Sequence, residues 1–221
     1  MTDAPAPRLS PWWMLAPALL FIANFVGGLF TNGSSQKNTV YDATAIVGTV
    51  VVDLVLIAYV LFAAWASRRP IGPTLALRRT PLRPALKLGG AAAGLVIVSN
   101  LVLEPFLHAS QRQGIAPTHD PRNTHQWVVL AIAVMGLVLV APAAEELVFR
   151  GLGFAALGRF ALPATTVLFA LAHGLAVLLI PVAIAGFLLG LLRMRTASVY
   201  PGMGVHMTLN ALALGLALLV S

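Results

Sequence analysis

The sequence predicts an all-α, polytopic bundle of transmembrane helices, and two observations lead to this fold class. Of the 221 residues 59% are hydrophobic and 10% are charged, with a mean hydropathy of +0.89, whereas soluble domains carry about 25% charged residues. The apolar residues also form continuous runs of about 20 residues, the length that a helix needs to cross a bilayer. These runs are too long for barrel strands, so helices are the predicted elements.

Seven spans are predicted in chain order. They cover residues 12–30, 45–66, 87–107, 127–149, 162–179, 181–194 and 202–220. The fifth and sixth are short and are separated by Pro181, so six and eight spans are the alternatives. The first run is expected to stay in the protein as a helix, because no small-residue cleavage site follows it.

Basic residues predict the orientation. If the N-terminus is cytoplasmic, eleven of the fourteen Lys and Arg residues fall on the cytoplasmic side, and only Lys37, Arg112 and Arg122 fall outside. This bias follows the positive-inside rule. The basic residues lie in short clusters between apolar runs, so nucleic-acid binding is not predicted. The chain has no cysteine, which excludes a thiol nucleophile and a cysteine zinc site.

Two carboxylates and an arginine close the fourth apolar run. Such groups cost roughly 2.5–3.5 kcal/mol each at membrane depth, so they need a reason to be there. Glu146 and Arg150 are four residues apart, about 40° around a helix, and are expected to pair. Glu145 then points elsewhere. The alternative is an interfacial ion cluster in which Arg150 reaches up to the lipid headgroups.

Three further polar residues lie on the later runs. His206 and Asn210 are four apart and share one helix face, and Phe169 precedes His173 by the same spacing. The alternative for each is a hydrogen bond that joins packed helices. Taken together, one carboxylate and two imidazoles can activate water for hydrolysis, and Asn210 can donate to a developing oxyanion.

These residues form three motifs that resemble the CAAX protease and bacteriocin-processing (Abi) family of intramembrane proteases. The motifs are Glu145-Glu146-x-x-x-Arg150, Phe169-x-x-x-His173 and His206-x-x-x-Asn210, in this order. The resemblance covers about residues 90–220. It implies that the catalytic residues are Glu145, His173, His206 and Asn210, with Glu146, Arg150 and Phe169 in supporting positions.

The resemblance implies an intramembrane endopeptidase of the plasma membrane, with its active site toward the cytoplasmic half. Its substrate would be a membrane-associated polypeptide. A divalent metal, zinc, held by Glu145, His173 and His206 is the implied cofactor, and a glutamate that works without metal is the alternative. Residues 87–221 would form the catalytic core, and residues 1–86 would add two helices and a basic linker.

Two other functions are the alternatives. A non-catalytic protein of the same scaffold, serving in bacteriocin immunity or as a partner subunit, is expected to lose a motif residue, and none is lost. A small proton-coupled transporter is expected to show repeat symmetry and broken helices, and the sequence shows no clear repeat. Asp53, on the second run, is expected only to form an interhelical hydrogen bond.

Overall fold

The computed structural model describes residues 8–31, 43–108 and 124–220, and every regular element within them is helical. The all-α prediction is therefore confirmed. After a 3-10 turn at Pro11–Met14, the helices are α1 (Leu15–Thr31), α2 (Ala43–Ala66), α3 (Ile71–Thr74), α4 (Leu82–Leu107), α6 (Thr124–Val134), α7 (Ala141–Glu146), α8 (Gly153–Leu157), α9 (Ala161–Ala172), α10 (Leu179–Thr196) and α11 (Tyr200–Val220).

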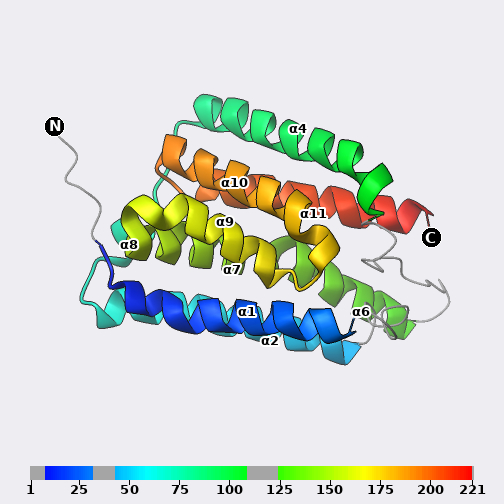
Figure 1. Cartoon of the computed structure of the whole chain (residues 1–221), viewed down its shortest axis with the longest axis horizontal. Coiled ribbons are helices and arrows are strands. Elements are labelled where there is room, and N and C mark those ends of the chain that lie inside the picture. Colours follow the sequence, from blue (N-terminus) through cyan, green and yellow to red (C-terminus); the bar gives the residue numbers. More distant parts are fainter. Residues whose placement is uncertain (1–7, 32–42, 109–123, 221) are drawn as a thin grey trace.

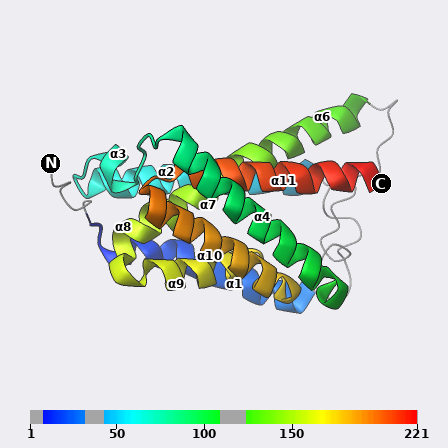
Figure 2. The same cartoon turned by 90° about the horizontal axis from the view of Figure 1, so that it is seen from above.

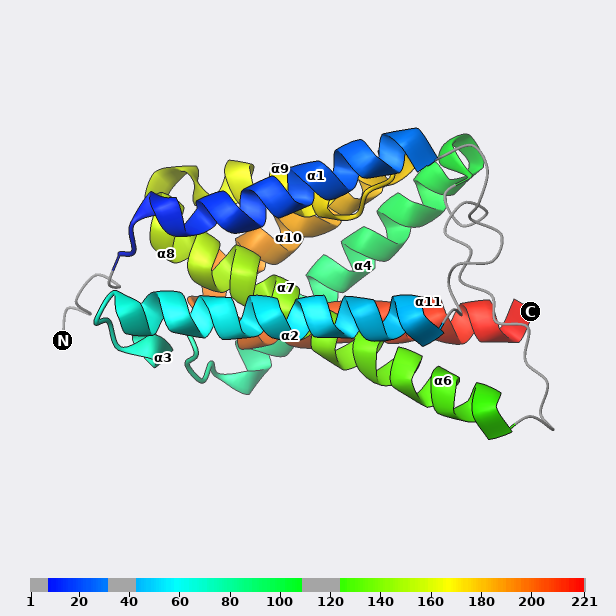
Figure 3. The ribbon, with the colours of Figure 1, turned by 90° about the horizontal axis from the view of Figure 1, so that it is seen from below.

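The motif-bearing helices lie in the middle of the bundle (Figure 1). Helix α1 packs against α9, and α2 packs against α7. On the other side α10 contacts both α9 and α4, while α11 contacts α4 and α7. In the turned views α4 crosses the bundle obliquely over α10 and α11 (Figure 2), and α2 lies alongside α7 (Figure 3). Helices from both ends of the chain therefore enclose α7.

Residues Thr124–Leu157 run through three helices, α6, α7 and α8, joined by two π-helical turns. These turns are Met135–Val140 and Leu147–Leu152, and they flank α7 on either side. Single π turns inside α-helices are frequent at functional sites. The run ends at Gly158, whose φ of +55° and ψ of −120° suit only glycine, and α9 then packs back against α8.

Five segments are long and apolar enough to cross a membrane. They are Pro11–Phe30, Ile46–Ala66, Leu82–Leu107, the bent run Leu130–Ala172, and Ala176–Thr196. The chain is thus a multi-pass membrane protein by length and composition. The count of seven spans and the cytoplasmic N-terminus remain expectations, because Lys37, Arg112 and Arg122 lie outside the described residues.

The predicted fifth span, 162–179, is wrong. Helix α9 ends at Ala172 after 12 residues, about 18 Å of helix, which is shorter than the roughly 30 Å hydrocarbon core. His173 is followed by Gly174 with a φ of +71°, and this left-handed residue stops the helix. Apolar composition continues past this point, so hydropathy alone placed the end of the helix too late.

The most deeply buried segment is the second π turn. All six residues of Leu147–Leu152 are buried. Phe149 stacks on Phe21 of α1 with ring centroids 5.0 Å apart, and it meets Phe169 of α9 edge-on at 5.2 Å. This packing places the end of the first motif at the centre of the molecule.

Candidate active site

Arg150 lies at the core of the site and is fully buried. Its Nη1 is 3.0 Å from Glu146 Oε1, and its Nη2 donates a 2.8 Å hydrogen bond to the Gly186 carbonyl of α10. Its guanidinium carbon is 4.4 Å from the centroid of the Phe169 ring, a cation–π distance. The predicted pair of Glu146 and Arg150 is confirmed, and the alternative in which Arg150 reaches the headgroups is wrong.

His206 lies between the two carboxylates of the first motif. Its Nε2 is 3.6 Å from Glu145 Oε2, and its Nδ1 is 3.5 Å from Glu146 Oε1. Both separations are longer than an ordinary hydrogen bond. The Glu145 side chain is 23% exposed, whereas that of Glu146 is fully buried. Glu145 is therefore the carboxylate that water can reach, and its orientation away from Arg150 agrees with the helical angles.

His173 occupies the end of α9, as its C-cap residue, rather than the interior of a span. Its Nδ1 lies 2.9 Å from the Phe169 carbonyl oxygen. A carbonyl oxygen can only accept, so Nδ1 carries the hydrogen and Nε2 is the basic nitrogen. The ring is half-buried, and the α9 backbone thus sets both its tautomer and its orientation.

The Phe169 ring contacts the rings of both histidines. Its ring centroid is 5.0 Å from that of His173 and 5.7 Å from that of His206. The same ring lies under the Arg150 guanidinium. The supporting position predicted for Phe169 is therefore a packing position, in which one aromatic ring contacts the side chains of all three motifs.

Asn210 is on the same side of α11 as His206, but its amide is engaged in the bundle. Its Nδ2 donates a 2.8 Å hydrogen bond to the carbonyl of Leu137, inside the first π turn. One of its two amide hydrogens therefore connects α11 to the run that carries Glu145. The second hydrogen is the one that an oxyanion role would require.

Gly202, one turn before His206, was not predicted from the sequence as a site residue. A Cβ at this position would lie 2.5 Å from Glu146 Oε2 and 3.3 Å from its Cδ. The α11 backbone can approach the buried carboxylate this closely only because the residue is glycine. The Gly186 carbonyl, which binds Arg150, was also missed, since the sequence does not show which backbone oxygens face a side chain.

The first two helices, which lie outside the family resemblance, also reach the site. Asn24 of α1 donates a 2.8 Å hydrogen bond to the Ala172 carbonyl, next to His173. Asp53 of α2 is buried, interacts electrostatically with Glu145, and leaves its Oδ2 without a hydrogen-bond partner among the described residues. The hydrogen bond expected for Asp53 is therefore not made by this oxygen.

The residues expected to bind a metal do not form a ligand set in this arrangement. Within the ranges that the structure describes, no three His, Asp or Glu side chains are grouped so that they could hold a metal ion. Glu145 and His206 are neighbours, while His173 lies across the Phe169 ring.

Residues 125–212 match the family model for type II CAAX prenyl endopeptidase, Rce1-like. This segment contains all three motifs, from Glu145 to Asn210, and the match confirms the family resemblance. No curated protein and no solved structure matches the chain.

Proposed function

We propose that this protein is an intramembrane endopeptidase of the CAAX type that hydrolyses peptide bonds of membrane-associated polypeptides. The Rce1-like match supports the class of reaction. The observation that carries the mechanism is the place of His206, with Nε2 toward the accessible Glu145 and Nδ1 toward the buried Glu146. In this proposal the attacking water binds at the exposed part of the Glu145 carboxylate, beside the His206 ring, whose Nε2 lies 3.6 Å from the buried Oε2 atom of Glu145.

In this proposal Glu145 is the general base. It takes a proton from this water, and the hydroxide adds to the carbonyl carbon of the scissile peptide. The tetrahedral intermediate collapses when the C–N bond breaks, and the proton held by Glu145 passes to the leaving amine. The direct products are a carboxylic acid and an amine, which become a carboxylate and an ammonium group when the acid gives its proton to the amine, and Glu145 is ready for a second cycle.

Glu146 and Arg150 have a positioning role. Glu146 is fully buried and paired with Arg150, so it is not reachable as a base for water. Its negative charge beside Nδ1 of His206 favours a hydrogen on that nitrogen, which turns Nε2 toward Glu145. The pair thus orients the imidazole as a buried carboxylate does in a hydrolase triad.

His173 and Asn210 are the candidates for stabilising the oxyanion. His173 presents Nε2, because Nδ1 is held by the Phe169 carbonyl, and when protonated this nitrogen can donate to the developing charge. Asn210 has one amide hydrogen in addition to the one given to Leu137. A single well-placed donor contributes about 3–4 kcal/mol to transition-state stabilisation in soluble proteases.

The substrate, the membrane and the cofactor are parts of the same proposal. The apolar helices that surround Glu145 favour a polypeptide already held in the bilayer. The distribution of basic residues favours a site in the cytoplasmic half, and the plasma membrane is the membrane that we propose. Zinc bound by Glu145, His173 and His206 is the alternative way to activate water, and it requires His173 to move toward the other two residues.

The test compares peptide termini in the membrane fractions of cells that express the wild type or Glu145→Gln. This substitution keeps the shape of the side chain and removes the base, so new termini should fall at least about 100-fold. Glu104→Gln, at the far end of α4, is the matched control and should cleave like the wild type. If Glu145→Gln generates the wild-type set of termini at an equal expression level, the proposed mechanism is wrong.

A further inference from the structure

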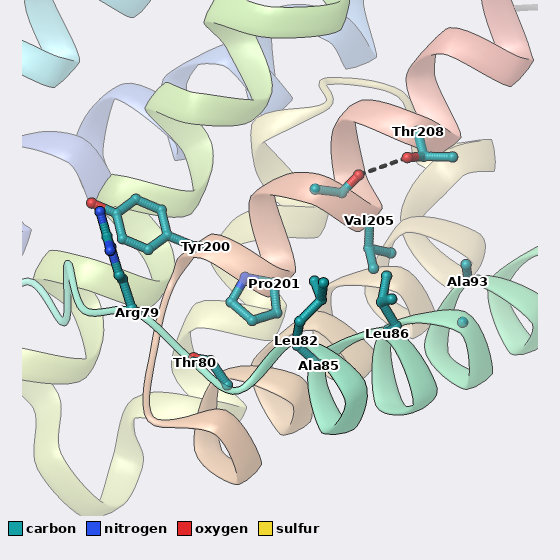
Figure 4. Close-up of a pocket in the computed structure, with 13 residues that line it drawn as sticks. Arg79, Thr80, Leu82, Ala85, Leu86, Ala93, Tyr200, Pro201, Val205 and Thr208 are labelled. Carbon is teal, nitrogen blue, oxygen red and sulfur yellow. Dashed lines mark hydrogen bonds between the residues drawn. The ribbon is translucent and has the colours of Figure 1, made fainter.

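A cavity lies between α4 and α11, away from the carboxylates. It has a volume of about 630 Å³ (Figure 4), within the roughly 300–1,000 Å³ of small-ligand sites. On α11, Pro201, Gly204 and Val205 line it, whereas Gly202 and His206 face Glu146. Helix α11 therefore separates this groove from the candidate active site.

The walls of the groove are apolar. Leu82 and Leu86 of α4 line it and are 70% and 65% exposed. The Thr208 hydroxyl donates to the Gly204 carbonyl at 2.8 Å, so it adds no unpaired donor to the groove. A polypeptide in this groove would leave its amides without partners, whereas a hydrocarbon chain needs none.

Glycines keep the groove open. A Cβ added at Gly90 of α4 or at Gly204 of α11 would meet no atom within 4 Å, and both residues line the cavity. At Gly89, by contrast, an added Cβ would lie 3.0 Å from Val205 Cγ2, which marks where the two helices meet at the base of the groove. The open space is therefore a channel beside a close helix contact.

One end of the groove is cationic and rich in hydrogen-bond donors. Arg79, Thr80 and Tyr200 line this end, where α4 and α11 both begin (Figure 4). The Thr80 Oγ1 is buried and has no hydrogen-bond partner among the described residues. No side chain caps α4, which follows Pro81, so its first-turn N–H groups and its dipole favour an anion.

Arg79 is the arginine available for such an anion. Arg78 is engaged elsewhere, because its Nε donates a 2.6 Å hydrogen bond to the Ala197 carbonyl. Arg79 is exposed and lies at the rim. A cationic rim above an apolar groove on membrane-spanning helices matches the chemistry of a lipid with a negatively charged headgroup.

We propose that this groove binds one anionic phospholipid of the bilayer. An acyl chain lies between α4 and α11, beside Leu86 and Gly90. The phosphate lies at the N-terminus of α4, where the exposed Arg79 donates to its oxygens. This site is independent of the proposed peptidase activity, since none of these groups touches Glu145 or His206.

The experiment measures lipid binding to the full-length protein in detergent by native mass spectrometry, with phosphatidylglycerol and phosphatidylcholine as probes. The wild type should bind one phosphatidylglycerol at least about fivefold more tightly than phosphatidylcholine, the effect of one basic residue at a membrane surface. Gly90→Leu fills the groove and should lose the bound lipid. Gly94→Leu, one turn along α4, also has open space at its Cβ but does not line the groove, and should bind like the wild type.

A second pair of variants tests the headgroup. Arg79→Gln should remove the preference for phosphatidylglycerol, whereas Arg83→Gln, equally exposed but not lining the groove, should keep it. This pair leaves the helix packing untouched, so it decides the question even if Gly90→Leu does not fold. Equal binding of both lipids by the wild type would overturn the proposal. So would equal lipid binding by Gly90→Leu and Gly94→Leu, together with an equal headgroup preference of Arg79→Gln and Arg83→Gln. Displacement of the lipid by a farnesylated peptide would also overturn it, and would make the groove a substrate channel.

Discussion

Replacing Arg150 by Met tests whether the buried ion pair holds the site together. The substitution keeps most of the side-chain volume but leaves the fully buried Glu146 carboxylate without its cation. Breaking a buried pair in this way costs about 3–5 kcal/mol. For a chain of this size each kcal/mol lowers the melting temperature by roughly 2–4 °C, so a drop of about 6–20 °C is expected.

The assay is thermal unfolding of the purified protein in detergent, with two companion variants. Glu146→Gln/Arg150→Met removes both charges and should recover most of the loss. The melting temperature of this double variant should remain below that of the wild type, because the Gly186 carbonyl still loses its buried donor. Arg159→Met is the control, since Arg159 is exposed at the α8–α9 turn, and it should melt like the wild type.

Two results would refute this reasoning. One is an Arg150→Met protein that melts within about 2 °C of the wild type, less than the expected loss of a buried pair. The other is a double variant no more stable than Arg150→Met, which would show that an unpaired Glu146 charge is not the cause of the loss. Either outcome would make Arg150 an ordinary packing residue.

Two further predictions concern the geometry and the chemistry of the site. Gly202→Ala should lower the free energy of unfolding by about 1–3 kcal/mol and reduce cleavage, since its Cβ would meet Glu146 Oε2 at 2.5 Å. The control is Gly204→Ala, whose Cβ has open space and which should unfold at or slightly above the wild-type temperature. Equal melting temperatures of the two variants would count against the close approach of α11 to Glu146. In the mechanism that we propose, Glu145 activates water without a metal, so cleavage should survive prolonged EDTA treatment. Loss of activity that zinc restores, followed by elemental analysis, would instead assign Glu145, His173 and His206 as ligands.

Much of the site could be predicted from spacing. Glu146 and Arg150 at an interval of four residues predicted their ion pair, and the structure has it at 3.0 Å. The same interval predicted that Phe169 covers His173, and their rings are 5.0 Å apart. These contacts lie within one helix, where 3.6 residues per turn decides which side chains are neighbours. The catalytic roles themselves remain predictions.

Contacts between helices could not be predicted in this way. Spacing did not indicate that His206 lies between Glu145 and Glu146, or that Asn210 binds the Leu137 carbonyl. The helix end at Ala172 was also missed. Hydropathy reports only that a segment is apolar, and a segment that leaves the helix inside a bundle is as apolar as one that continues.

The sequence by itself determined the all-α membrane class, the motif residues and the pairing of Glu146 with Arg150, because composition and helical periodicity are properties of local sequence. Only the tertiary structure decided that His206 lies between Glu145 and Glu146, where glycine lets α11 approach Glu146, and where α4 and α11 leave a groove. These features depend on how the helices pack against one another, and that packing is set by close contacts between residues far apart in the chain.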